Sequence, residues 1–399
     1  MCEIKNNMHD LAIFGGEPLF KESKSTSNLV KPDVNSFLSY SKKMFDSKIY
    51  TNNGCLLLEL EDRLANFHQT KYCVAFNSGF WALALSIREF HIKGKTEVII
   101  PSLTYRRLAD IIYWAGLTPV FCDVDFNTLA VSRELIEKHL TSNTALVLAV
   151  HPIINTCDVH GISELCKEKS IPLLFDSVES VYETAKGDKI GGFGLGECFS
   201  LHASKFINGF EGGYLTTNDK FVYDRLKYLR AFGFDSPERI IGLGINAKMN
   251  EIHAAMALSC MDELDSQVIK NKNIYRRYKY RLRDFPGFKL VEFDEHEKTS
   301  FKNILVEVTG IWKSKRDFIV SLLNAEGILS RSYYDPPLHH GSFFSITYKL
   351  DNTEVLSKKF ILMPCGHHVS ETDVDKILDL LFIIYDNFDN ICSEMEVSI

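Results

Sequence analysis

The stretch Ile171-Pro-Leu-Leu-Phe175, which delivers Asp176, and the run Cys198-Phe-Ser-Leu-His-Ala-Ser-Lys205 decide how this chain folds. The first is a short apolar run, typical of a buried strand, and a carboxylate follows it. Sheets of parallel strands carry their functional side chains at the carboxyl ends of the strands, where Asp176 is expected. A lone Asp after a strand usually only opens a loop, and a lone Lys is usually solvated. The rest of the sequence therefore has to decide between these interpretations.

A carboxylate and a lysine amine in one site are what a pyridoxal phosphate enzyme requires. The amine forms a Schiff base with the cofactor aldehyde, and the carboxylate keeps the pyridine nitrogen protonated so that the ring can accept electrons. Asp176 and Lys205 are candidates for these two catalytic groups, with pyridoxal 5′-phosphate as the cofactor, and a loop-opening Asp and a solvated Lys remain the alternative at this point.

Strand-like apolar runs alternate with helical patterns over the first half of the chain. This alternation favours an α/β fold, with a large and mostly parallel sheet flanked by helices. A helical, charged stretch over residues 249–282 then leads to a part with mixed strands and helices. We expect residues 1–264 to form an N-terminal arm and a large domain, and residues 265–399 to form a smaller C-terminal α+β domain. The expected strands are residues 72–76, 97–100, 118–122, 145–150, 171–175, 197–201 and 213–217.

The composition argues against several other classes of protein. The net charge is -7 and no Lys/Arg-rich block occurs, so no nucleic-acid partner is expected. The apolar runs are shorter than the roughly 20 residues of a membrane helix, and the N-terminus lacks the features of a secretory signal, so we expect a cytoplasmic protein. The ten cysteines are scattered and are interpreted as buried free thiols. The pairs His339-His340 and His367-His368 lack metal-ligand spacing, and adjacent histidines on a strand point to opposite faces, so no metal site is expected.

Seven short blocks follow one another along the chain: Phe76-Asn-Ser-Gly79, Glu97-Val-Ile-Ile-Pro-Ser-Leu-Thr-Tyr105, Pro119-Val-Phe-Cys-Asp-Val-Asp125, Phe175-Asp-Ser-Val-Glu179, Phe199-Ser-Leu-His-Ala-Ser-Lys205, Phe210-Glu-Gly-Gly213 and Gly244-Ile-Asn-Ala-Lys-Met-Asn-Glu251. Together and in this order they resemble the DegT/DnrJ/EryC1/StrS family of sugar aminotransferases, over most of the chain. Each block alone is a weak signal. The resemblance implies the type I, aspartate aminotransferase-like fold of pyridoxal phosphate enzymes.

The resemblance also assigns roles around the cofactor ring. It implies that Lys205 is the Schiff-base lysine and the base that moves a proton between the substrate and the cofactor, and that Asp176 pairs with the pyridine nitrogen. Tyr105 would stack on the ring face, although a core aromatic at a strand end gives the same pattern. Glu179 would lie beside the ring hydroxyl, where the family typically has Gln or His. An extra carboxylate there alters the charge balance of the site.

The cofactor phosphate needs amide donors at a helix N-terminus. The resemblance implies the amides of Gly79 and Phe80, the hydroxyl of Ser200 and, as a weaker second, that of Ser204. Asn246 matches an asparagine that reaches the phosphate from the neighbouring subunit, which implies a homodimer. The alternative for Asn246 is a turn residue at a helix entry.

The substrate contacts follow the family less closely. Phe80 and Trp81 stand where smaller residues are usual, Ile153-Ile154 replaces a frequent Tyr-Gly, and Lys248 replaces a frequent Arg. These departures concern the substrate more than the use of the cofactor. The candidates for contact with a substrate diphosphate are Lys248, His339 and Arg230, the last of which is alternatively a solvated surface residue.

The resemblance implies an aminotransferase that moves an amino group, with glutamate as the expected donor, to a keto group of a nucleotide-linked deoxysugar. One alternative is a family enzyme with a non-sugar acceptor or a dehydratase-like reaction, and another is a non-catalytic relative. The dehydratase relative has His in place of the Schiff-base lysine, and a scaffold needs neither Lys205 nor Asp176. The sequence does not define the sugar, the nucleotide or the position of the new amine.

Overall fold

A seven-stranded sheet forms the centre of the larger lobe of the computed structural model, which describes residues 5–27, 30–341 and 348–395. Of its strands, β10 alone runs antiparallel to its neighbours, so the expected mostly parallel sheet is confirmed. The strands lie in the order β2 (Tyr72–Phe76), β10 (Gly213–Thr217), β9 (Gly196–Ser200), β6 (Leu173–Asp176), β5 (Thr144–Val150), β3 (Glu97–Pro101) and β4 (Thr118–Cys122).

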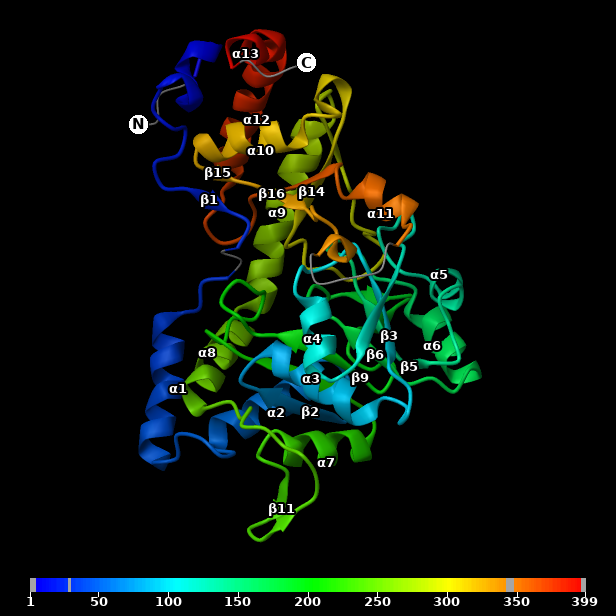
Figure 1. Cartoon of the computed structure of the whole chain (residues 1–399). Helices are drawn as coiled ribbons and strands as arrows, with labels where there is room; N and C mark the ends of the chain where they lie inside the picture. The colour runs from blue at the N-terminus through cyan, green and yellow to red at the C-terminus, as the bar shows by residue number, and fades with distance from the viewer. Residues whose placement is uncertain (1–4, 28–29, 342–347, 396–399) are drawn as a thin grey trace.

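Helices cover both faces of this sheet (Figure 1). Alternate side chains of each strand point into two separate cores. Along β2, Val74 and Phe76 pack into one core, while Cys73 and Ala75 pack into the other, as the period of two in a strand requires. One face carries α3 (Gly79–Phe90), α4 (Leu108–Trp114) and α7 (Lys220–Leu229), and the other carries α2 (Cys55–Phe67), α6 (Val159–Glu168) and α8 (Glu251–Asp262). Further elements of this lobe are α1 (Val34–Ser47), α5 (Arg133–Glu137), and the strand pairs β7 (Thr184–Ala185) with β8 (Asp188–Lys189) and β11 (Phe234–Ser236) with β12 (Arg239–Ile240).

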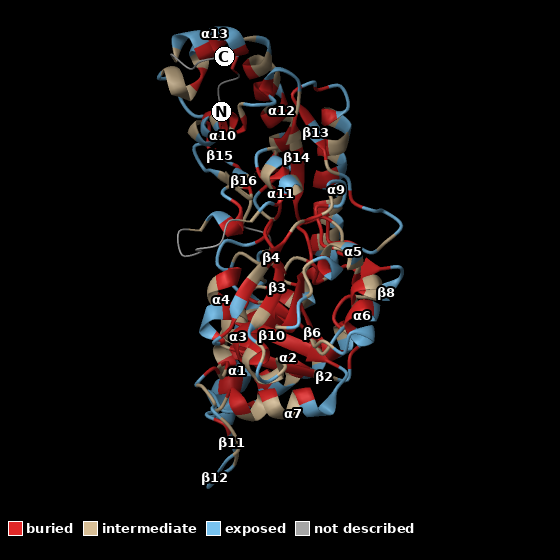
Figure 2. Ribbon diagram, turned by 45° about the vertical axis from the view of Figure 1, so that its right-hand side comes forward, coloured by how far each residue is buried: buried red, intermediate tan, exposed pale blue. Residues whose placement is uncertain are grey.

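A second, antiparallel sheet forms the smaller lobe. The strands of this second sheet lie in the order β13 (Phe288–Leu290), β14 (Ile304–Val308), β17 (Phe360–Met363) and β16 (Arg331–Tyr333). Figure 2 shows buried residues concentrated in both lobes. The helices of this part are α9 (Leu264–Leu282), α10 (Arg316–Ala325), α11 (Asp351–Leu356), α12 (Glu371–Asp386) and α13 (Phe388–Glu394). No helix in the described part of the chain is both long and apolar enough to span a membrane.

The N-terminal arm lies against the smaller lobe (Figure 1). Its strand β1 (Lys24–Ser25) pairs in parallel with β15 (Ile328–Leu329). The buried carboxylate of Glu326 accepts hydrogen bonds from the backbone N–H groups of Ala12 and Leu19, at 2.6 and 2.8 Å. The arm, which the sequence grouped with the large domain, therefore contacts the C-terminal part. The division near residue 265, where α9 begins, stays a prediction.

The expected strand positions agree with the structure to within two residues at each end. The expected helical stretch over residues 249–282 divides at Glu263 into α8 and α9. The apolar runs predicted the positions of the strands well, because a strand that is buried on both faces must be apolar along its whole length.

Candidate active site

A cavity of about 930 Å³ opens where three strands of the large sheet end. Val150, Asp176 and Ser200 are the last residues of β5, β6 and β9, and all three line the cavity. Its other walls come from the smaller lobe and from the N-terminal arm, which contributes Thr26 and Ser27. The cavity therefore forms where the two lobes and the arm meet. Of the residues predicted from the sequence, it is lined by Gly79, Phe80, Tyr105, Asp176, Glu179, Ser200, Ser204 and Lys205.

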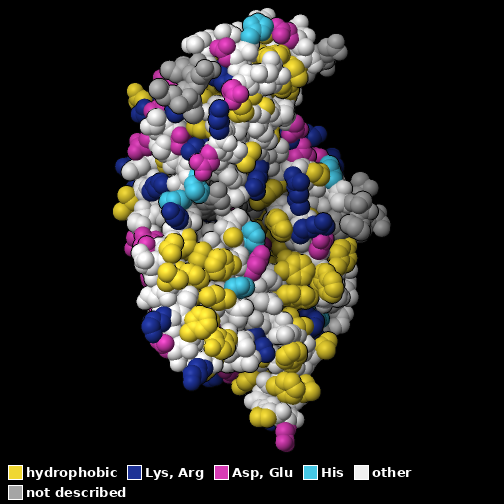
Figure 3. Space-filling view, turned by 90° about the vertical axis from the view of Figure 1, so that its left-hand side faces the viewer, with side chains coloured by type: hydrophobic (Ala, Val, Ile, Leu, Met, Phe, Trp, Pro, Cys, Tyr) yellow, Lys and Arg dark blue, Asp and Glu magenta, His cyan; other side chains and the backbone are white. Residues whose placement is uncertain are grey.

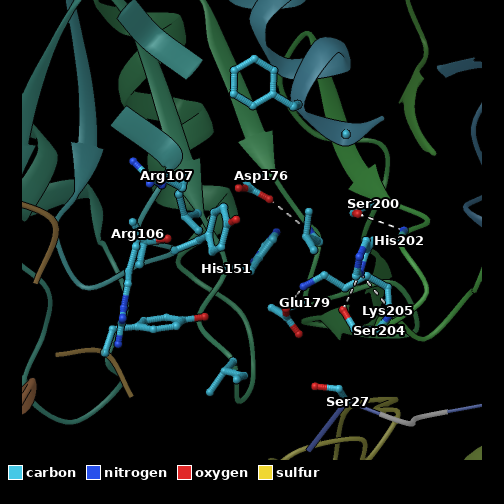
Figure 4. A pocket seen from close by; sticks show the side chains of 18 of the residues that line it. Ser27, Arg106, Arg107, His151, Asp176, Glu179, Ser200, His202, Ser204 and Lys205 are labelled. Atoms are coloured by element: carbon cyan, nitrogen blue, oxygen red, sulfur yellow. Dashed lines mark hydrogen bonds and ion pairs between the residues drawn. The ribbon is translucent and has the colours of Figure 1, made fainter. Parts of the chain in front are cut away.

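The amine of Lys205 lies inside this cavity and is held by Glu179 (Figure 4). Lys205 Nζ donates to Glu179 Oε1 at 2.7 Å. The Lys205 side chain is 27% exposed, so a ligand in the cavity can still reach the amine. Burial by itself lowers the pKa of Lys205, but the Glu179 carboxylate outweighs burial and raises that pKa above its ordinary value. The amine is therefore charged at rest, and it must lose a proton before it can act as a nucleophile.

Asp176 is buried at the end of β6, across the cavity from this ion pair (Figure 4). Among the described residues, its carboxylate has one hydrogen-bond donor, the backbone N–H of Val178, at 3.2 Å. Burial raises the pKa of Asp176 from 3.8 to about 6, and the opposing effects of Val178 and Lys205 are weaker. A buried carboxylate with so few donors is suited to bind a cationic N–H group from a ligand, because a charge-assisted bond would stabilise its ionised form.

The start of α3 forms a cradle of backbone amides beside Ser200. Ser78 caps the helix, with its hydroxyl accepting from Trp81 N at 3.3 Å. The amides of Gly79 and Phe80 have no acceptor within the part of the chain that the structure describes. A Cβ on Gly79 would lie 3.3 Å from Phe199 O and 3.4 Å from Ser200 Cβ, so glycine permits this close approach of helix and strand. Free amides at a helix N-terminus next to a hydroxyl are a site for a phosphate group.

Aromatic side chains cover one side of the cavity. Tyr105 follows β3 and is 58% exposed, so its ring is not part of the core and the core alternative is wrong. Phe80 packs edge-on against Trp81, with ring centroids 5.3 Å apart, and Trp81 packs in the same way against Trp114 at 5.8 Å. The bulk of Phe80 and Trp81 therefore belongs to an aromatic cluster at the start of α3.

Two of the predicted residues, Asn246 and Lys248, do not line the cavity of this chain. Asn246 is exposed, and its backbone forms an isolated bridge with Ala231. The residue that caps the next helix is Asn250, so the helix-entry alternative for Asn246 is wrong. Lys248 Nζ lies over the ring of Phe232, 5.0 Å from its centroid. The expected roles of Asn246 and Lys248 stay predictions.

His339 and Arg230 are held inside the protein instead of facing a ligand. His339 Nδ1 bonds the hydroxyl of Ser102 at 2.6 Å, and its Nε2 bonds Glu354 Oε1 at 2.9 Å, so neither ring nitrogen is available for the expected diphosphate contact. Arg230 is 1% exposed and forms a 2.5 Å ion pair with Glu61. Both interpretations of Arg230, a diphosphate partner and a solvated residue, are therefore wrong.

The two histidines of the pair at residues 339–340 also behave differently from expectation. Both Nε2 atoms bond Glu354 Oε1, at 2.9 Å for His339 and 2.6 Å for His340. The prediction that the two rings point to opposite faces is wrong, because Leu338–His340 is a 3-10 helix and not a strand. The expected absence of a metal stays a prediction.

Several residues of the site were missed in the sequence. Arg106, Arg107 and Arg331 line the cavity, and Arg331 donates to the Ser27 hydroxyl at 2.7 Å. Lys302 is buried and donates to the second carboxylate oxygen of Glu179. One feature of the sequence could have indicated Lys302. It lies in the apolar run that leads into β14, where a buried charge needs a partner. Nothing in the sequence set the arginines apart from solvated ones.

These features fit bound pyridoxal phosphate. A lysine amine, a buried carboxylate that lacks a cationic partner, a cradle of free amides and an exposed tyrosine ring all line one cavity. They match the aldehyde, the ring nitrogen, the phosphate and the ring face of that cofactor in turn.

Known proteins of similar sequence and structure agree with this assignment of the cofactor. The model of the DegT/DnrJ/EryC1/StrS aminotransferase family matches residues 33–382. The dTDP-4-amino-4,6-dideoxy-D-glucose transaminase of Shigella dysenteriae is 25% identical over 353 residues, which cover 88% of this chain and 96% of that protein. A GDP-perosamine synthase of Escherichia coli O157:H7 is 30% identical over 245 residues, covering 61% and 67% of the two chains.

Among solved structures, DesI in the presence of its TDP-sugar product superposes with a TM-score of 0.91 at 29% identity, covering 97% of this chain and 99% of that one. The expected type I fold is thereby confirmed. The family match covers most of the chain, from α1 to α12. The chain therefore belongs to the DegT/DnrJ/EryC1/StrS aminotransferase family and is a pyridoxal-phosphate-dependent aminotransferase.

Proposed function

We propose that this enzyme transfers an amino group from an amino acid, with glutamate as the expected donor, to a keto group of a nucleotide-linked deoxysugar. The observation that carries the proposal is the cavity of about 930 Å³. It is lined by both Lys205 and Asp176 and is larger than the cofactor alone requires. The named relatives are transaminases and synthases of dTDP- and GDP-linked amino sugars, which supports this class of acceptor.

The side chains of the site divide the work of such a reaction. Bound pyridoxal phosphate supplies the electron sink that makes the proton on the reacting carbon acidic. Lys205 Nζ lies in the cavity and is the group that takes this proton from the donor and later returns one to the sugar carbon. Glu179 orients the amine through its 2.7 Å bond. Asp176 keeps a proton on the ring nitrogen, because its buried carboxylate is stabilised by a positive partner.

Arg106 and Arg331 are the proposed contacts for the anionic part of the substrates. Both line the cavity, and neither forms an ion pair with a carboxylate in the described ranges of the chain. Arg106 donates to the backbone carbonyl of Asp335 at 2.7 Å, and Arg331 to the Ser27 hydroxyl. Their remaining N–H groups can bind a diphosphate or a carboxylate in a bidentate manner. These arginines take the place that the sequence gave to His339 and Arg230.

We further propose a homodimer with shared sites. Figure 3 shows the face that carries α1, where hydrophobic side chains lie on both sides of a hollow. On α1, Val34, Leu38 and Phe45 are 60%, 56% and 61% exposed, which is unusual for apolar residues that have no partner. In a symmetric dimer, Asn246 of each subunit would serve the cofactor phosphate of the other.

Complementation between two weakened variants tests the shared site. Lys205→Ala and Asn246→Ala homodimers are each expected to have low activity. After mixing and subunit exchange, the hybrid has one site with an intact Lys205 from one subunit and an intact Asn246 from the other, so activity should rise. A mixture that stays as inactive as its components means that Asn246 does not act across the interface.

The proposed reaction is tested by incubating the purified holoenzyme with glutamate and a panel of keto-sugar nucleotides. Mass spectrometry should detect the change from keto to amine in at least one of them, together with 2-oxoglutarate in equal amount. The Lys205→Ala variant is the control and should form neither product. Conversion of a non-sugar keto compound, with none of the nucleotide sugars, would overturn the proposed acceptor.

A further inference from the structure

Glu179 is shared by two lysines from different lobes. Lys205 follows β9 in the large lobe, and Lys302 precedes β14 in the small lobe. The carboxylate accepts from Lys205 Nζ at Oε1 and from Lys302 Nζ at Oε2. The Lys302 side chain is 2% exposed, whereas those of Glu179 and Lys205 are 19% and 27% exposed. Lys302 is thus the most enclosed member of this group.

The enclosed amine has no hydrogen-bond or ion-pair partner other than Glu179 in the described part of the chain. Lys302 does not line the cavity, and its one hydrogen bond and one ion pair are both to Glu179. A buried charge is costly unless it is paired. Glu179 and Lys302 are therefore two buried or half-buried charges of opposite sign, each held by the other.

We propose that Lys302 is a positioning residue that neutralises Glu179, so that Glu179 can orient Lys205 beside the cofactor without adding net negative charge to the site. The inference rests on the proposed role of Lys205. Lys302 does not line the cavity, so a ligand that engages Lys205 would leave the contact between Lys302 and Glu179 in place. The pair Glu179–Lys302 then behaves as one neutral unit.

The charged and titratable groups around Glu179 agree with this balance. They are Asp176 at the end of β6, Lys205 after β9, Lys302 before β14, and Tyr333 and Tyr334 at the end of β16. Burial alone would raise the pKa of Glu179, but the two ammonium groups outweigh it and hold that pKa well below its ordinary value. Removing either lysine therefore makes the ionised form of the Glu179 carboxylate less stable.

The test is a cycle of variants at residues 179 and 302, read by titrating the visible absorbance of the bound cofactor without any substrate. Lys302→Met removes a positive charge, which favours protonation in the site, so the pH midpoint should rise by about one unit. Glu179→Gln removes a negative charge, so the midpoint should fall by about one unit. The double variant should return close to the wild-type midpoint, and Lys302→Arg, which keeps the charge, should hardly move it.

A second measurement separates this role from a merely structural one. Glu179→Gln leaves the buried Lys302 amine unpaired, so thermal unfolding of the apo-protein should begin earlier, and adding Lys302→Met should restore it. The control is Lys189→Met, which removes a half-buried lysine that does not line the cavity and donates to Val181 O at 3.0 Å. It should lower thermal stability without moving the absorbance midpoint.

The proposal is overturned if Lys302→Met changes thermal stability alone, as Lys189→Met should, or if the two midpoint shifts do not cancel in the double variant. Neither reading requires a sugar substrate, so failure to find the acceptor leaves the test intact. If the wild type shows no cofactor at Lys205 after borohydride reduction, the proposed function fails, and this inference fails with it.

Discussion

Replacing Asp176 with Asn should stabilise the apo-enzyme while weakening its hold on the cofactor. The wild-type carboxylate is buried with a single amide donor, Val178 N–H, and without a cationic partner in direct contact. An Asn side chain can keep that hydrogen bond through its Oδ1 atom and carries no charge. The substitution therefore removes an unfavourable buried charge from the apo-protein, but also removes the group that binds a protonated ring nitrogen.

The size of the effect follows from the pKa of Asp176, which burial raises from 3.8 to about 6. A folded-state pKa above the unfolded one means that stability present at low pH is lost as the pH rises through the folded pKa. With a shift of about two units, wild-type apo-protein should lose about 3 kcal/mol by pH 8, at 1.36 kcal/mol for each unit. At pH 5 the loss should be about 1.5 kcal/mol. Asp176→Asn avoids this loss at both pH values.

Urea unfolding of the two apo-proteins at pH 5 and pH 8 measures this difference. The variant should be the more stable of the two, and its advantage should roughly double between the two pH values. Asp125→Asn is a control that should lower stability instead of raising it. The backbone N–H groups of Thr128 and Asn127 hold the pKa of Asp125 below its ordinary value, so the charged carboxylate stabilises the fold there. A wild type that equals or exceeds Asp176→Asn in stability at pH 8 would refute the idea of an uncompensated buried carboxylate.

Four other substitutions give expected outcomes that are measured separately. Borohydride reduction of the holoenzyme should label Lys205 in a peptide map, and Lys205→Ala should carry no label and show no transamination. Phe80→Thr should retain the cofactor more tightly in dialysis, because a hydroxyl can bond the phosphate, but should turn over the natural sugar more slowly because the aromatic cluster at the start of α3 is broken. Arg230→Met should lower the free energy of unfolding by about 3–5 kcal/mol in urea titrations, because it leaves the Glu61 carboxylate buried without its partner. Arg331→Gln should raise the KM of one half-reaction about 10- to 100-fold, the effect of losing a hydrogen bond to a charged group, and comparing the glutamate and sugar half-reactions shows which anion it binds.

Most of the residues predicted for the cofactor line one cavity, because they lie at fixed places along the chain. Asp176 ends an apolar strand, Gly79 opens a helix, and Lys205 lies in a short loop after a strand. Each of these positions is set by local patterns of burial and helix capping. Parallel strands then bring the ends of β6 and β9 together at one edge of the sheet, so local features suffice to assemble the site.

Contacts between distant parts of the chain were not predictable in this way. His339 resembled a substrate ligand in sequence, but the fold places Ser102 and Glu354 against its two ring nitrogens. Arg230 resembled a solvated cation, but it is enclosed beside Glu61, 169 residues away in sequence. Whether a polar side chain faces a ligand or a buried partner depends on the packing of separate elements, and no periodic pattern in the sequence records that.

The sequence alone predicted the order of strands and helices along the chain, the candidate catalytic pair Lys205 and Asp176, and a phosphate cradle at the start of a helix. Each of these depends on residues that are close along the chain or on strand ends that a parallel sheet must align. Only the tertiary structure decided which charges pair. It joined Glu179 to Lys302, 123 residues further along, and left Arg331 facing the cavity. The physical reason is that the cost of a buried charge is set by its neighbours in space, which are supplied by lobes and segments far apart in sequence.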